Sequence, residues 1–350
     1  MSFDRFMAAA LYHPELGFYA SGRTRTGTSG DFLTPVSPGP VLGQLLAAQV
    51  EDLHRALGRP RKIRLLEQGA DAGWLARDLL KTVLHHYPQL ARAMTFHLIE
   101  PLPRLAQKQK EALREIDRAV QWHSSWETVP EDGIPSVFYS CELVDSFPVR
   151  IFRYREGAWR QQGVGWEGSR FCWQETAIDP VSSAEIHHWR APALEGLTVE
   201  LRPSVRTWAQ DWTKRISQGL VLTLDYGFPA EELFLPERPG GTLVALRRHQ
   251  TSSDPLADPG QQDLTAHVNF TELEELAARE GWRNYGLTDF SRGLTALAAP
   301  FLQDGKNPAG AWIRNFRHLT HPSFFGKTHK ILVQGKALPE SFRPAVLGKI

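Results

Sequence analysis

The chain has 350 residues, of which 42% are hydrophobic and 23% charged, a globular composition that excludes extensive disorder. A formal net charge of +1 excludes the strong basic field that draws proteins to nucleic acids or anionic membranes. The two cysteines cannot form a disulfide framework, and no His or Cys spacing is typical of a metal site. No apolar run approaches the roughly 20 residues needed to span a bilayer. We therefore expect a soluble, cytoplasmic protein that binds neither nucleic acid nor metal and has no membrane span; its oligomeric state is not predicted.

Residues 1–60 are predicted to form an N-terminal extension of helix and loop. An amphipathic helix opens the chain, and a Gly/Ser/Thr-rich loop follows from Gly17 to Gly30. Aromatic residues in and beside this loop indicate that it packs against another part of the protein. Apolar residues at helical spacing then predict a helix from Val41 to about Leu57.

Short apolar strands and amphipathic helices alternate in the next part of the chain. Strands are predicted at 62–67, 94–100, 136–141 and 220–225, and the helices between the first three at 74–84 and 103–118. This alternation predicts an α/β fold with a mostly parallel sheet flanked by helices.

The predicted core comprises residues 61–150 and 200–336. Between its two parts, residues 150–200 are rich in Trp, Gln, Arg and Gly, and aromatic alternation broken by Glu-Gly predicts a β-hairpin-rich insertion. The last helix that we predict covers residues 271–280.

The first strand is followed by Glu67-Gln-Gly-Ala-Asp-Ala-Gly73. Gly69 and Gly73 allow a tight turn into a helix and a close approach of the backbone to a ligand, although such turns also occur where they only pack. The GxGxxG pattern of a dinucleotide loop is absent, which disfavours a nicotinamide dehydrogenase. Asp71 occupies the place of a middle glycine, where it would either crowd a ligand or adopt a tolerated left-handed conformation.

Acidic residues also follow the second and third predicted strands. Glu100 is placed to bind a ribose 2′- and 3′-hydroxyl pair, or else to stabilise the start of the next helix. Glu142 and Asp145 are three apart, so a helical turn would put both carboxylates on one side, where they could hold a guanidinium. One helix cap and one solvated acid would give the same spacing. Cys141 lacks an adjacent histidine and is expected to be structural.

Taken together, these residues resemble the MidA-like (DUF185) methyltransferases, over approximately residues 5–336. This family includes the mitochondrial protein-arginine methyltransferase that assists assembly of respiratory complex I. The resemblance is carried by several motifs in order, namely Tyr12-His-Pro-Glu-Leu-Gly-Phe-Tyr19, Gly30-Asp-Phe-Leu-Thr34, Glu142-Leu-Val-Asp-Ser-Phe-Pro-Val149, Asp225-Tyr-Gly227, Gly241-Thr242, His249, Asp254-Pro-Leu256 and Pro259-Gly-Gln-Gln-Asp-Leu-Thr-Ala-His-Val268.

The resemblance implies a class I, Rossmann-like methyltransferase that uses S-adenosyl-L-methionine and acts on arginine in a protein partner, possible acceptors including a respiratory-complex subunit. Residues 30–34 would fold over the cofactor. The implied cofactor-binding residues are Gly30, Asp31, Phe32, Thr34, Glu67, Gly69, Gly73, Glu100 and Asp225, and the implied catalytic residues are Glu142, Asp145 and His267.

The chain also departs from the family pattern. Asp71 replaces a glycine, and Cys141 replaces the usual Asn before Glu142. Asp289-Phe290 stands where a Thr-Gln pair is expected, and Lys327 and His329 change a Met-Gly-Glu-x-Phe-Lys motif. These departures leave a second hypothesis open, in which the chain is a catalytically degenerate relative that serves as a binding or assembly module.

Overall fold

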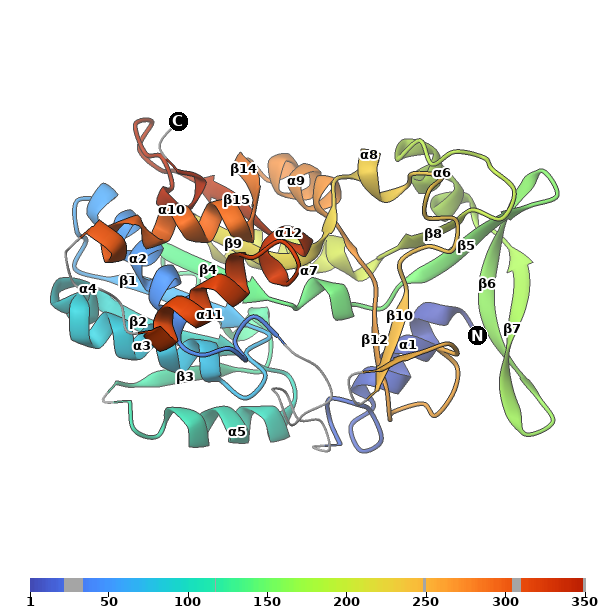
Figure 1. The fold of residues 1–350 in the computed structure, drawn as a ribbon, viewed down its shortest axis with the longest axis horizontal. Helices are drawn as coiled ribbons and strands as arrows, with labels where there is room; N and C mark the ends of the chain where they lie inside the picture. Colours follow the sequence, from blue (N-terminus) through green and yellow to red (C-terminus); the bar gives the residue numbers. More distant parts are fainter. Residues whose placement is uncertain (22–33, 117, 248–249, 304–309, 349–350) are drawn as a thin grey trace. The chain divides into compact units, whose positions relative to one another are not determined.

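The structure is a computed structural model that describes residues 1–21, 34–116, 118–247, 250–303 and 310–348 (Figure 1). The chain divides into two compact units. Unit 1 comprises Met1–Leu33, Val144–Trp208 and Gly227–Leu273, and unit 2 comprises Thr34–Leu143, Ala209–Tyr226 and Glu274–Ile350. This division differs from the predicted domains, because the N-terminal 60 residues are shared between the units and 227–273 groups with the insertion.

Unit 2 contains the parallel sheet and the helices that cover it. Its elements, including three that cross the unit boundary (α7, β9 and α9), are α2 (Val41–Ala56), β1 (Ile63–Gln68), α3 (Trp74–His86), α4 (Pro88–Ala93), β2 (Met94–Ile99), α5 (Pro103–Leu113), β3 (Val120–His123), β4 (Ser136–Cys141), α7 (Ser204–Arg215), β9 (Gly219–Phe228), α9 (Phe270–Arg279), β14 (Arg283–Asp289), α10 (Phe290–Gln303), α11 (Gly310–Thr320), α12 (Phe325–Thr328) and β15 (His329–Lys336).

The strands of unit 2 lie in the order β14-β15-β9-β4-β1-β2-β3. Strands β9, β4, β1, β2 and β3 are parallel, while β15 is antiparallel to both β9 and β14. The chain leaves β1 toward β2 and β3 and then returns to β4 on the other side of β1. Such a reversal leaves a crevice at the carboxyl ends of the strands, where ligands of α/β proteins bind.

Both faces of this sheet are buried, as expected for parallel strands. Val137 and Tyr139 of β4 join the large apolar cluster that contains residues of α2, α3 and α10. Phe138 points to the opposite face, where its ring contacts Trp126 and Trp212. The α/β fold with a mostly parallel, helix-flanked sheet is thus confirmed.

Unit 1 is built mainly from antiparallel strands. Its elements are α1 (Phe3–Tyr12), β5 (Arg150–Arg155), β6 (Ala158–Glu167), β7 (Arg170–Ala177), α6 (Pro180–His188), β8 (Thr198–Leu201), α8 (Ala230–Leu233), β10 (Val244–Arg247), β11 (Gln250–Ser252), β12 (Asp263–Thr265) and β13 (Val268–Asn269). One sheet has the order β7-β6-β5-β8 and another the order β11-β10-β12. The predicted hairpin-rich segment therefore forms a sheet of its own.

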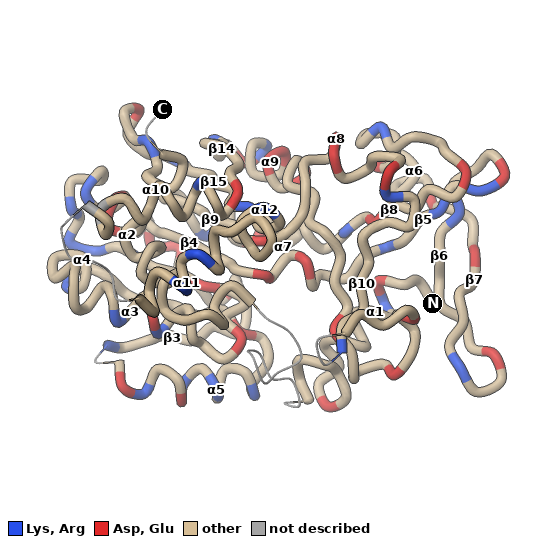
Figure 2. Tube along the Cα trace, in the orientation of Figure 1, with Lys and Arg blue, Asp and Glu red and all other residues tan. Residues whose placement is uncertain are grey.

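Charged residues of both signs are interspersed along the chain, in keeping with the small net charge (Figure 2). Within the described ranges, no helix is long and apolar enough to cross a membrane. Those same ranges contain no group of three His, Cys, Asp or Glu side chains arranged to hold a metal ion.

Candidate active site

The candidate site lies in unit 2, at the carboxyl ends of β1, β2, β4 and β9. The loop after β1 and the segment after β4 approach each other closely there. A Cβ atom at Gly69 would lie 3.0 Å from Leu143 Cδ1, and Gly69 has a φ of 80°. A glycine is therefore required at this position both for its backbone conformation and for the space beside it.

The loop after β1 passes through three left-handed positions before α3 begins. Gly69, Asp71 and Gly73 have φ values of 80°, 42° and 84°. Asp71 thus adopts the left-handed conformation that was one of the two alternatives for this position, and this conformation costs Asp less than most other residues.

The side chain of Gln109 links this loop to the next one. Its Nε2 donates to the Asp71 carbonyl at 3.1 Å and to Glu100 Oε2 at 2.9 Å, while its Oε1 accepts from Trp122 Nε1 at 3.2 Å. Gln109 is fully buried and was not predicted as a site residue. The sequence did contain a signal for Gln109, because a polar amide at helical spacing between Leu105 and Leu113 stands on the buried face of α5.

Glu100 follows β2 directly and is 8% exposed. Its Oε1 accepts from the Leu102 backbone N–H at 2.9 Å, so both alternatives considered for Glu100 remain compatible with its position. Burial raises the pKa of Glu100 to about 7, and its hydrogen bonds from Leu102 and Gln109 act in the opposite direction. Since a carboxylate has about four acceptor positions, each Glu100 oxygen retains one for a further donor.

Glu67 lies near the end of β1, inside the sheet. Its Oε2 accepts from the Tyr139 hydroxyl at 2.6 Å. Burial raises the pKa of Glu67 to about 8, and the Tyr139 hydrogen bond offsets part of the rise. Glu67 is therefore largely protonated at neutral pH.

Glu142 follows β4 and has a φ of 50°, in the left-handed region. Strained backbone of this kind is concentrated at functional sites. Its Oε1 lies 2.8 Å from His329 Nε2, at the start of β15, and His329 Nδ1 lies 3.0 Å from Thr328 Oγ1. The Phe325, Phe290 and Tyr226 rings surround the imidazole of His329. The Glu142–His329 pair is thus held in a mostly apolar setting.

Two further departures from the family pattern, Lys327 and Asp289, form an ion pair. Lys327 Nζ lies 2.6 Å from Asp289 Oδ2, just beyond the antiparallel pair of β14 and β15. Asp225 lies three residues before the end of β9 and is fully buried, and its Oδ1 accepts from the Tyr226 N–H at 2.9 Å.

Asp145 and His267 belong to unit 1, and the structure brings them together around Arg202. Asp145 Oδ2 accepts from Thr265 Oγ1 at 2.8 Å. The guanidinium of Arg202 donates to the Asp145 carbonyl at 3.3 Å and to the His267 carbonyl at 3.1 Å. Glu142 contacts His329 and Asp145 accepts from Thr265, and no single helical turn contains both of these residues, which were predicted to act together.

Gly30, Asp31 and Phe32 lie outside the described residues. Thr34 is described and buried, and its backbone N–H donates to Ser37 Oγ at 3.0 Å in a turn that precedes α2.

These residues fit the nucleoside and sulfonium of S-adenosylmethionine. Gly69 and Gly73 present backbone without side chains, and Glu100 offers free acceptor positions for two ribose hydroxyls. Glu142 and Asp225 add carboxyl groups at the same edge of the sheet, where a cationic sulfonium would be stabilised by negative charge, whereas Glu67 contributes a mostly neutral carboxyl.

The two alternatives for Asp71 make different predictions. If Asp71 is only a tolerated left-handed residue, Asp71→Gly will leave the affinity for S-adenosylhomocysteine unchanged, while Asp71→Val will lower the free energy of unfolding by about 1–2 kcal/mol relative to Asp71→Gly. Calorimetric titration and urea denaturation measure the two quantities. A large gain in affinity in Asp71→Gly would instead support crowding of the ligand.

Comparison with known proteins places the chain among methyltransferases. Residues 45–288 match the sequence pattern of a family described as "Putative S-adenosyl-L-methionine-dependent methyltransferase". A Drosophila melanogaster protein named protein arginine methyltransferase NDUFAF7 homolog, mitochondrial, is 28% identical over 304 residues, which are 79% of this chain and 66% of that protein. The Danio rerio protein arginine methyltransferase NDUFAF7, mitochondrial, is 27% identical over 311 residues, which are 79% of this chain and 68% of that protein. The chain thus spans about two thirds of the length of these curated relatives.

A solved structure shows the same fold. A Burkholderia thailandensis protein crystallised with S-adenosyl-homocysteine superposes with a TM-score of 0.88 at 24% identity, covering 100% of this chain and 90% of that one. The family match covers well over half of the chain and includes the loop after β1, Glu100 and Glu142. The chain belongs to this family of S-adenosyl-L-methionine-dependent methyltransferases.

Proposed function

We propose that this protein is a protein-arginine N-methyltransferase, in which Glu142 binds the guanidinium of the acceptor. The observation that carries the proposal is the strained, half-buried position of Glu142 beside the switch point of the sheet. The names of the Drosophila and Danio relatives support arginine as the accepting residue.

S-adenosylmethionine supplies an already activated methyl group, so the protein's contribution is to bind, orient and desolvate the acceptor. A carboxylate at position 142 would accept two N–H groups of an arginine side chain and direct one terminal nitrogen toward the methyl carbon. The new C–N bond forms as the S–C bond breaks, and the nitrogen loses one proton. The products are methylarginine, S-adenosylhomocysteine and that proton.

The acceptor is proposed to be a protein, with a subunit of a respiratory complex as the first candidate and the cytoplasm as the proposed location. Mass spectrometry of methylated arginines in cells with and without this protein tests the acceptor, and cell fractionation tests the location. Arginine sites that lose methylation only in the deficient cells are the expected result. An unchanged methylarginine profile would count against the proposal.

The alternative is a degenerate relative that acts as a binding module, motivated by Asp71 and the other departures. Calorimetric titration with S-adenosylhomocysteine distinguishes the two. Binding at micromolar concentration is expected of an enzyme, whereas no binding at millimolar concentration would favour the module.

A further inference from the structure

One face of the β7-β6-β5-β8 sheet in unit 1 carries side chains that the proposed methyl transfer does not use. The antiparallel register places Glu175, Gln162, Ile151 and Glu200 in one row across the four strands. Side chains alternate between the faces of a strand, so Arg153 and Arg155 share the face of Ile151. Phe152 and Val199 point the other way, into an apolar cluster with Ile186 of α6.

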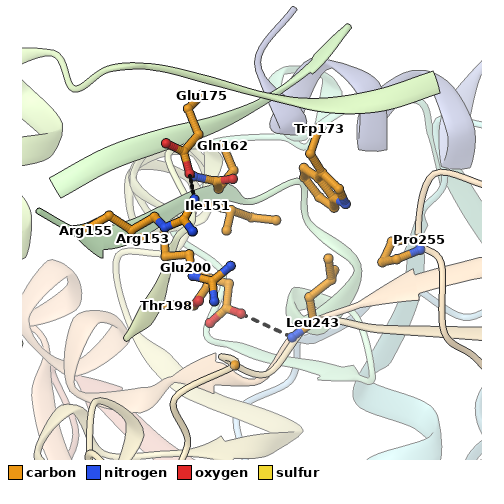
Figure 3. Close-up of a pocket in the computed structure, with 11 residues that line it drawn as sticks. Ile151, Arg153, Arg155, Gln162, Trp173, Glu175, Thr198, Glu200, Leu243 and Pro255 are labelled. Atoms are coloured by element: carbon orange, nitrogen blue, oxygen red, sulfur yellow. Dashed lines mark hydrogen bonds and ion pairs between the residues drawn. The ribbon is translucent and has the colours of Figure 1, made fainter. Parts of the chain in front are cut away.

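This face borders a cavity of about 480 Å³, within the size range of ligand sites. Figure 3 shows that its two ends differ in chemistry. Arg153, Arg155 and Glu175 lie toward one end, and Trp173, Leu243 and Pro255 toward the other. A ligand that fills the cavity must therefore combine a polar and an apolar group.

The polar end of the cavity carries two arginines and two glutamates, whose formal charges balance but whose side chains are not all paired with one another. Arg155 Nη1 lies 3.2 Å from Glu175 Oε1, which also accepts from Gln162 Nε2. Glu200 Oε1 accepts from the backbone N–H groups of Thr242 and Leu243 at 2.7 and 3.1 Å. Among the described residues, Arg153 has no hydrogen-bond or ion-pair partner. The pKa of the Glu175 carboxyl is lowered by its hydrogen bond from Gln162 and also by the Arg153 guanidinium, which makes no hydrogen bond to it, so the N–H groups of Arg153 can bind a carboxylate of a ligand.

Glu200 itself is held by a specific backbone arrangement. Gly241 has a φ of 78°, and a Cβ atom there would lie 2.2 Å from Glu200 Oε1. The Gly241-Thr242 pair thus gives the Glu200 carboxylate two donors and the space to reach them. Burial raises the pKa of Glu200, and the hydrogen bonds from Thr242 and Leu243 act in the opposite direction.

The apolar end is preformed and open to solvent. Trp173 is 41% exposed, and its ring stacks on Phe3 of α1 with centroids 5.1 Å apart. Because this stacking already restricts the indole, little side-chain entropy remains to be lost on binding. Trp166, on the neighbouring strand, is 62% exposed. Exposed Trp beside Arg is the composition of protein-binding hot spots rather than of enclosed small-molecule sites.

We propose that this pocket binds a segment of a protein partner that presents a carboxylate to Arg153 and an apolar or aromatic side chain to Trp173. The proposal does not require that the protein methylates arginine, because the pocket is formed entirely by residues of unit 1.

Fluorescence polarisation with the full chain tests this pocket. The probes are labelled peptides in which Asp or Glu is separated from Leu, Phe or Trp by zero to three glycines, each paired with its Asn or Gln counterpart. At least one acidic peptide is expected to bind about tenfold more tightly than its amide counterpart. Arg153→Gln should abolish this difference, and Trp173→Ala should weaken both peptides of the pair.

Arg170→Gln is the matched control, since Arg170 is an exposed arginine of β7 that does not line the pocket. This substitution should change neither the affinity for the acidic peptide nor that for its amide counterpart. Trp173→Phe keeps a ring against Phe3 and guards against misfolding of Trp173→Ala. Binding of no peptide to the wild type, or a preference for acid that survives in Arg153→Gln, would overturn the proposal. Titration of the same preparations with S-adenosylhomocysteine separates that failure from failure of the methyltransferase site.

Discussion

Replacement of Glu142 by glutamine is expected to lower turnover about 100-fold while leaving the dissociation constant of S-adenosylhomocysteine within about twofold. The amide retains the size of the side chain but loses the negative charge that would hold a guanidinium. An interaction made with the acceptor in the transition state affects turnover, whereas we propose that cofactor binding depends on the loops after β1 and β2.

Turnover can be measured as transfer of tritium from labelled S-adenosylmethionine to arginine in an extract of cells that lack the protein. Glu115→Gln serves as the matched control, because Glu115 is an exposed residue of the same unit. Wild-type turnover in Glu142→Gln would remove Glu142 from the mechanism. Loss of cofactor binding with unchanged turnover of the bound complex would assign it to the cofactor instead.

His329 is expected to act through Glu142. His329→Phe removes the 2.8 Å contact to Glu142 and should lower turnover less than Glu142→Gln does, by about 5- to 10-fold. His329→Gln, which can still donate an N–H group, should recover part of the loss. Equal activity in His329→Phe and the wild type would show that the contact is only structural.

The parts of the fold that follow from local sequence were predictable. Hydrophobic periodicity marks β1, α3, β2, α5, β4 and β9, and each was expected within a few residues of its observed bounds. No helix or strand was predicted beyond residue 280. In that segment β15 pairs with β9, which lies more than 100 residues earlier in the chain. Pairing over such a distance leaves no periodic signal.

The same distinction between local sequence signals and long-range contacts applies to the candidate site. Gly69, Gly73 and Glu100 follow strands directly, so their positions come from the strand assignment. The contact between Glu142 and His329 joins residues 187 positions apart, and no spacing rule predicts it. Glu142 and Asp145 were expected to share one helical turn, but Glu142 is left-handed and the short 3-10 helix begins only at Val144.

Several of the residues that depart from the family pattern have charged or hydrogen-bonding partners in the structure. Lys327 and Asp289 form an ion pair, and His329 contacts Glu142. Three of these departures are thus connected to each other or to a predicted catalytic residue. Random decay of an unused site would leave such charged groups without complementary partners, so the connections support a site that still functions.

The dissociation constant of S-adenosylhomocysteine is expected to rise about tenfold between pH 8 and pH 6. The pKa of Glu100 is raised to about 7 by burial, so the carboxylate is mostly ionised at pH 8 and mostly protonated at pH 6. A protonated carboxyl cannot accept both ribose hydroxyls and must first lose its proton. Affinity is therefore full above the raised pKa and is lost as the pH falls through it.

Calorimetric titration in two buffers with different ionisation enthalpies measures both the affinity and the proton released. About one proton per ligand should be released at pH 6 and almost none at pH 8. Glu100→Gln should bind about 10- to 100-fold more weakly at pH 8 and lose the pH dependence. Because the pKa of Glu67 is raised to about 8, Glu67→Gln is the necessary control for a second titrating group. If the pH dependence persists in Glu100→Gln and disappears in Glu67→Gln, the buried acid of β1 rather than the acid after β2 controls cofactor binding.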